Sequence, residues 1–171
     1  DANWIAWDCC GGTVPEVITD ADKGDAVKFN INDNNGTVLG FSTRGGHFPD
    51  DFTGTSSPFD ASPLLEVNGR LTFDMKVVTP PTSDTTWILK AEAGDGGPNT
   101  GDVPLSESNE GVTPVTGQWQ TYTFPLSLLQ EKGLDLSAID VLMVFPAWQT
   151  GEGAEYLITN VAIEGDLGAS P

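Results

Sequence analysis

Leu71-Thr72-Phe73-Asp74-Met75-Lys76-Val77 is the stretch that decides the fold class. Apolar residues alternate with polar ones along its whole length, so in an extended chain the four apolar side chains share one face and the three polar ones share the other. An amphipathic helix would instead repeat its apolar residues three and four positions apart. The stretch therefore predicts a strand with one face in a core and one face in solvent.

Similar short segments lie on both sides of this stretch, separated by turn residues such as the Asn-Gly pair at 35–36. The 20 glycines and 12 prolines among 171 residues favour many short strands over long helices. We predict one all-β domain over 1–166, a jelly-roll β-sandwich of two antiparallel sheets, followed by a linker at 167–171. The other expected strands are 27–31, 38–44, 87–93, 119–124, 141–145 and 156–163. Short helical turns are expected at 60–63, 126–129 and 134–139.

The charge of the chain is strongly negative, with 25 Asp and Glu against 7 Lys and Arg, or −18 net. Nucleic-acid binding needs a basic patch, and an anionic membrane repels an acidic protein, so we expect neither partner. An acidic surface suits a soluble monomer in a saline medium. We expect a module of a larger secreted protein, or one in the periplasm or at the cell surface of a Gram-negative bacterium.

The two cysteines, Cys9 and Cys10, are adjacent, so neither can bridge to a distant part of this chain. A disulfide between them would be strained, because neighbouring Cα atoms lie only about 3.8 Å apart. Two buried reduced thiols are the alternative. An oxidising exterior favours the disulfide, which we predict.

The sequence offers little for catalysis. It holds one histidine, His47, and none of the common nucleophile, zinc-protease, phosphate-loop or dinucleotide motifs. Among 25 carboxylates some pairs meet by chance, so a pair alone is not evidence for a glycosidase. We predict that the chain is not an enzyme.

Its five tryptophans are candidates for binding sugars, with core packing as the alternative for each. An indole ring fits the apolar C–H face of a pyranose, and covering roughly 70 Å² of it contributes about 2 kcal/mol. Trp148 is the best candidate, because it follows the buried run 141–145 into a loop, with Gln149 next to it.

Charged residues on two predicted strands complete the candidate site. Arg44 is one of only two arginines and is expected on the strand face opposite Phe41. Lys90 and Glu92 share one face of the strand 87–93, where they would bond to sugar hydroxyls. We add Trp87 of the same strand, although alternation gives it the core-facing side.

Three segments resemble carbohydrate-binding modules. The segment 117–126 (GQWQTYTFPL) resembles the Gly-x-Trp segment of jelly-roll modules, and 156–163 (YLITNVAI) resembles their closing strand. The segment 4–13 (WIAWDCCGGT) resembles the start of the extra C-terminal domain of marine bacterial family 3 exo-β-1,3/1,4-glucanases. This likeness extends over nearly the whole chain.

The resemblance implies a module that is attached to the catalytic domain of a polysaccharide-degrading enzyme and binds β-glucan, either β-1,3-linked as in laminarin or of mixed linkage. The alternatives are a spacer that binds no sugar and a module for agarose, alginate or carrageenan. The resemblance also implies a structural Ca²⁺, an ion that takes about six to eight oxygen ligands. Asp22, Asp25 and Asn160 are the expected ligands, and the loop 95–102 is a second candidate.

Overall fold

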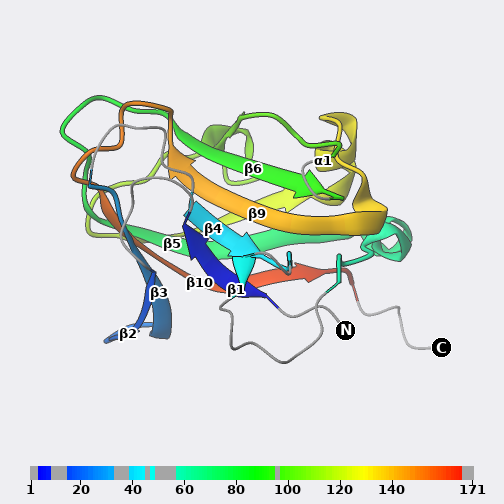
Figure 1. Cartoon of the computed structure of the whole chain (residues 1–171), viewed down its shortest axis with the longest axis horizontal. Helices are drawn as coiled ribbons and strands as arrows, with labels where there is room; N and C mark the ends of the chain where they lie inside the picture. Colours follow the sequence, from blue (N-terminus) through cyan, green and yellow to red (C-terminus); the bar gives the residue numbers. More distant parts are fainter. Residues whose placement is uncertain are drawn as a thin grey trace.

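The computed structural model describes residues 4–8, 15–32, 39–44, 47–48, 57–94 and 97–166, and it is a sandwich of two five-stranded antiparallel sheets (Figure 1). The first sheet has the order β1 (Ile5–Asp8), β4 (Leu39–Ser42), β9 (Ile139–Pro146), β6 (Trp87–Ala93) and β7 (Val103–Pro104). The second has the order β2 (Glu16–Asp20), β3 (Gly24–Asn30), β10 (Glu155–Glu164), β5 (Arg70–Thr79) and β8 (Trp119–Pro125). The prediction of an all-β sandwich is confirmed.

Helical structure is short and lies between strands. The α-helix α1 spans Leu126–Glu131, and 3-10 turns span Ser62–Val67, Leu105–Glu107 and Leu136–Ala138. Three of these four elements overlap the turns expected from the sequence. Across the described ranges, none of the helices has the length and apolar character that a membrane crossing would require.

Strand β5 shows the alternation that its sequence predicts. Its four apolar side chains, at 71, 73, 75 and 77, are at most 2% exposed and face the other sheet. The expected strands all form, with ends that shift by up to three residues. The short strands β1, β2 and β7 were not expected, because runs of two to five residues at or near the sheet edges give little periodic signal.

The core between the sheets is rich in aromatic rings. Tyr156 of β10 is fully buried, stacks on Phe29 at a centroid distance of 5.3 Å and meets Trp87 edge-on at 5.0 Å. Its hydroxyl donates a 2.6 Å hydrogen bond to the carbonyl oxygen of Val144 in β9. This bond joins the central strands of the two sheets across the core.

Strand β3 accompanies β10 over only half of its length. It pairs with Glu155–Ile158, whereas β5 pairs with β10 as far as Glu164. The β10–β5 register shifts between Thr159 and Ala162, where Asn160 has the left-handed φ of 53°. Within the described part of the chain, the second half of β10 therefore has no neighbouring strand on the β3 side.

Replacing Tyr156 with Phe tests the bond across the core. We expect a loss of about 1–3 kcal/mol in the free energy of unfolding, measured by urea denaturation, because the Val144 carbonyl loses a buried donor. The control is Tyr122→Phe, whose hydroxyl donates to the side chain of Gln120 over 3.2 Å within the same strand. Equal losses in both variants would contradict a special role for the bond between sheets.

Candidate binding face of the first sheet

The outer face of the first sheet brings together residues from four strands. Lys90 of β6 pairs with Met143 of β9, Met143 with Gly40 of β4, and Gly40 with Trp7 of β1. At the usual strand spacing this row is about 14 Å wide. A second row of paired residues runs beside the first, from Glu92 of β6 to β1. The polar side chains of Lys90 and Glu92 and the aromatic ring of Trp7 therefore border the same face.

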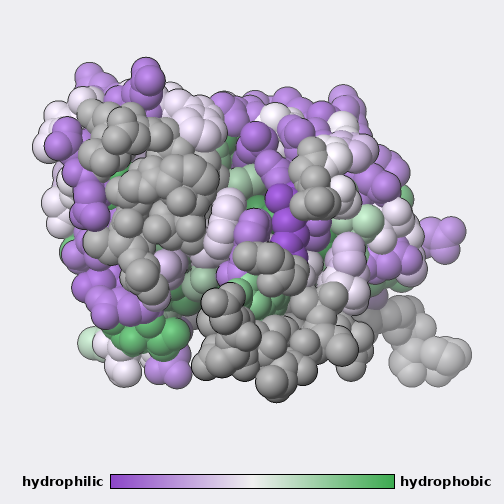
Figure 2. Space-filling model, in the orientation of Figure 1, coloured by the Kyte–Doolittle hydropathy of each residue, from purple (hydrophilic) through white to green (hydrophobic). Residues whose placement is uncertain are grey.

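The centre of this face is an apolar cluster separate from the main core. It consists of buried side chains from β6 and β9 against which Trp7 and Ala147 pack, and its members are Ile88, Val141, Met143 and Phe145. The first sheet is turned toward the viewer in Figures 1 and 2, and Figure 2 shows strongly hydrophilic and hydrophobic residues next to one another on this face. The four cluster residues of β6 and β9 are at most 5% exposed, so they support this face from below and do not themselves contact a ligand.

A charged cluster lies on this face. The Arg44 guanidinium donates to both carboxylate oxygens of Asp140, at 3.0 and 3.1 Å, and to Glu92 at 2.7 Å. Lys90 Nζ is 3.8 Å from the other oxygen of Glu92. The structure therefore gathers Arg44, Lys90 and Glu92, which the sequence singled out. Together with Asp140 they form a cluster of two cations and two carboxylates, which carries no net charge.

Asp140 is the member of this cluster that sequence reasoning missed. It lies where the β6–β9 register shifts, beside Glu92, and its side chain is only 3% exposed. Burial would lower the pKa of Arg44, but hydrogen bonds to Asp140 and Glu92 outweigh it and raise that pKa. The guanidinium therefore stays charged, and the fork of Arg44 is fixed by a bidentate carboxylate.

A second aromatic element lies at the β1 side. The rings of Trp7 and His47 stack with centroids 4.2 Å apart and planes within 10°. His47 Nδ1 is hydrogen-bonded to the hydroxyl of Ser42 over 2.6 Å. No periodic signal links residues 7 and 47, so the sequence could not reveal this pair.

Trp148 lies in the loop after β9 and is 46% exposed. Its ring meets Phe145 edge-on, with centroids 5.8 Å apart, so it extends the apolar cluster toward solvent. Gln149, also exposed, has the left-handed φ of 66°, a costly conformation for a residue other than glycine. Thr150 helps to hold this turn, because its hydroxyl donates to the Ala147 carbonyl over 2.6 Å and pairs with the Thr85 hydroxyl.

Trp87 is not part of this face. It is 8% exposed and packs between the sheets against Tyr156. Its inclusion among the sugar-binding candidates was therefore wrong, and the alternation of its own strand gave the right placement.

The expected calcium ligands make other contacts. The Asp25 carbonyl oxygen accepts a hydrogen bond from the Thr159 hydroxyl, the Asn160 amide donates to Asp74, and Asp22 is exposed. The described residues contain no group of three or more His, Cys, Asp or Glu side chains placed to hold a metal ion. Cys9, Cys10, part of the loop 95–102 and the linker 167–171 lie outside the described residues.

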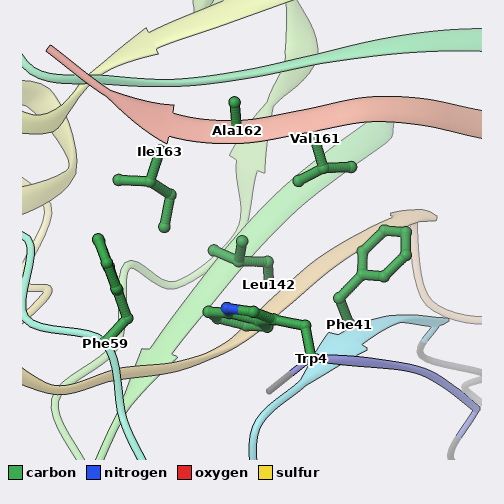
Figure 3. Close-up of a pocket in the computed structure, with 7 residues that line it drawn as sticks. All are labelled: Trp4, Phe41, Phe59, Leu142, Val161, Ala162 and Ile163. Carbon is green, nitrogen blue, oxygen red and sulfur yellow. The ribbon is translucent and has the colours of Figure 1, made fainter. Parts of the chain in front are cut away.

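A cavity of about 250 Å³ lies between the sheets, beside the second half of β10. Figure 3 shows its side chains around an open space, and its lining is entirely apolar: Trp4, Phe41, Phe59, Leu142, Val161, Ala162 and Ile163. Apart from the Trp4 indole N–H, these side chains have no hydrogen-bonding groups for the hydroxyls of a sugar. The outer face of the first sheet is therefore the better candidate for a saccharide.

No family model and no curated protein matches the sequence. Among solved structures, the chain is similar to the family 30 carbohydrate-binding module of the cellulosomal cellulase Cel9D-Cel44B of Clostridium thermocellum, with 19% identity, coverage of 96% of this chain and 94% of that one, and a TM-score of 0.64. A family 11 module of Clostridium thermocellum, in complex with a β-1,3-1,4-mixed-linked tetrasaccharide, has 15% identity, 95% and 89% coverage and a TM-score of 0.54.

An exo-β-agarase is also similar, with 16% identity and a TM-score of 0.54, over 97% of this chain but 23% of the agarase. The likeness to the family 3 exo-glucanase domain stays a prediction. The chain has the jelly-roll fold of carbohydrate-binding modules.

Arg44→Met tests whether the charged cluster is a rigid part of the face. We expect the free energy of unfolding to fall by about 2–4 kcal/mol in urea denaturation, because Asp140 keeps a buried charge without its partner. The matched control is Arg70→Met. Arg70 pairs with Glu164 and Asp166, which are 49% and 61% exposed, so we expect a loss below about 1 kcal/mol. Similar losses would mean that the cluster is an ordinary surface network.

Proposed function

We propose that this chain is a non-catalytic carbohydrate-binding module that holds a neutral β-glucan, β-1,3-linked or of mixed linkage, on the outer face of its first sheet. The observation that carries the proposal is the exposed ring of Trp148 on Phe145, next to the apolar cluster that this face shares with a charge-balanced group of hydrogen-bonding side chains. The parent protein would be a secreted polysaccharide-degrading enzyme.

Trp148 supplies the stacking surface. Covering roughly 70 Å² of a pyranose C–H face on the indole contributes about 2 kcal/mol before the cost of ordering the sugar. The ring is already fixed by Phe145 and by a turn whose threonine hydroxyls are paired, so little rotational freedom is lost on binding.

Lys90 and Glu92 supply groups that bond to hydroxyls. An ammonium donates, a carboxylate accepts, and a sugar hydroxyl does both, so such a pair suits a neutral polyol. Arg44 and Asp140 would act by holding Glu92 in place from the other side.

The charge balance favours a neutral ligand over alginate or carrageenan. Arg44 is matched by Asp140 and Glu92, and the chain as a whole carries −18, so a uronate or sulfate gains no net attraction. At low ionic strength, where the screening length exceeds about 10 Å, the repulsion is strongest.

The printed descriptions of similar structures support the proposal. The family 11 module binds a mixed-linkage tetrasaccharide, the family 30 module belongs to a cellulase, and the likeness to the exo-β-agarase covers only a part of that larger chain. A module attached to a polysaccharide-degrading enzyme accounts for all three.

Affinity electrophoresis in gels with laminarin, mixed-linkage glucan, agarose, alginate or carrageenan tests the ligand. We expect retardation by the first two and none by alginate or carrageenan. Trp148→Ala should weaken binding roughly 10- to 30-fold, as expected from the loss of one stacked ring.

Trp119→Phe is the control for this experiment, because Trp119 faces outward from the second sheet, and we expect it to bind like the unaltered chain. Unchanged binding by Trp148→Ala would place the site elsewhere. No retardation in any gel would favour the spacer, and retardation by agarose alone would replace β-glucan with agarose.

A further inference from the structure

The hairpin formed by β2 and β3 folds over the outer face of the second sheet. β2 and β8 are the two opposite edges of this sheet, yet the Trp119 indole of β8 donates to Asp20 of β2 over 3.1 Å. Lys23, in the turn of the hairpin, reaches Asp74 of β5 with a distance of 3.2 Å between Nζ and Oδ2. The hairpin tip therefore lies across β10 and is fastened to β5 and β8.

Hydrogen bonds within the hairpin turn fix the backbone that carries Lys23. The Asp20 carboxylate accepts hydrogen bonds from the backbone N–H groups of Asp22 and Lys23, at 2.8 and 3.0 Å, which is the pattern of an Asx turn. The Lys23 ammonium also lies 6.0 Å from the centre of the Trp119 ring, within reach of a cation–π interaction.

Asp74 is the buried anion that Lys23 meets. It lies on the outer face of β5 but is only 8% exposed, and it accepts from the Thr121 hydroxyl at 2.6 Å and the Asn160 amide at 2.8 Å. Burial raises the pKa of Asp74, but Thr121, Asn160 and Lys23 outweigh burial and lower it below its usual value. Asp74 is therefore ionised at neutral pH and needs a cation.

The residues around this anion do not fit the calcium ion that the sequence led us to expect. A Ca²⁺ would need about six to eight oxygen ligands. Instead, the Asn160 amide turns its N–H group toward Asp74, and the Asp25 carbonyl oxygen accepts a hydrogen bond from the Thr159 hydroxyl. The Lys23 ammonium lies within 3.2 Å of the Asp74 carboxylate and would repel a metal there.

We propose that Lys23 serves as a tethered cation that fastens the hairpin tip to the second sheet in the place of a metal ion. The positive charge is part of the chain itself, so this attachment of the hairpin tip does not depend on calcium. Lys23 contributes the positive charge that pairs with Asp74 of β5. Asp20 holds the turn through its hydrogen bonds to the backbone and binds Trp119 of β8.

Thermal unfolding of the full chain in EDTA and in millimolar CaCl₂ tests the proposal. We expect the unaltered chain to have the same Tm in both buffers. Lys23→Met should lower the Tm by about 3–6 °C in EDTA, because the buried charge of Asp74 loses the ammonium that pairs with it. Lys28→Met is the matched control on the same sheet face. Lys28 pairs with Glu16, which is 58% exposed, and we expect a change of less than about 2 °C.

Hydrogen exchange gives a second readout that does not depend on the global Tm. In Lys23→Met the backbone amides at positions 22 and 23 should exchange faster than in the unaltered chain, while the amides of β9 keep their protection. The proposal is overturned if the unaltered chain gains several degrees in CaCl₂ over EDTA, or if Lys23→Met melts like Lys28→Met.

Discussion

Strand β9 is buried on both of its faces, and the candidate site depends on this constraint. All eight of its residues are buried. One face belongs to the core between the sheets, and the other carries Val141, Met143 and Phe145 on the outside of the first sheet. A half-exposed strand at this position would leave the outer face polar throughout. Because β9 carries apolar residues on both sides, the charged residues of this face and Trp148 rest on a buried apolar layer.

Much of this arrangement could be predicted from local patterns. The alternation in β5 gave the fold class, and the unbroken apolar run at 141–145 is typical of a strand buried on both faces. The alternation in β6 correctly predicts that Lys90 and Glu92 face outward and that Trp87 faces the core. The prediction of Trp87 as a sugar contact departed from this alternation and was wrong. Trp148 could be placed in an exposed loop because it comes two residues after the end of β9.

The remainder depends on pairings between distant segments. Asp140 contacts Arg44 because the pairing register between β6 and β9 shifts at this point, and the residue types at 139–141 do not predict such a shift. Trp7 and His47 meet because β1 pairs with β4, strands that lie far apart in the sequence. The alternation of β5 predicts that the Asp74 carboxylate faces solvent, but it is buried because the hairpin formed by β2 and β3 folds over it. In each case the deciding contact spans more than 30 residues or depends on where a bulge falls.

The second half of β10 is a sheet edge without a neighbouring strand among the described residues, and it borders an apolar cavity. An open edge of this kind would offer backbone groups to any extended chain that approaches it, including another copy of the same molecule. Copies that each carry a charge of −18 repel one another before those backbone groups can meet. We expect the excess of carboxylates, which identifies no ligand, to oppose self-association, and to oppose it less as acid protonates the carboxylates or as salt screens them.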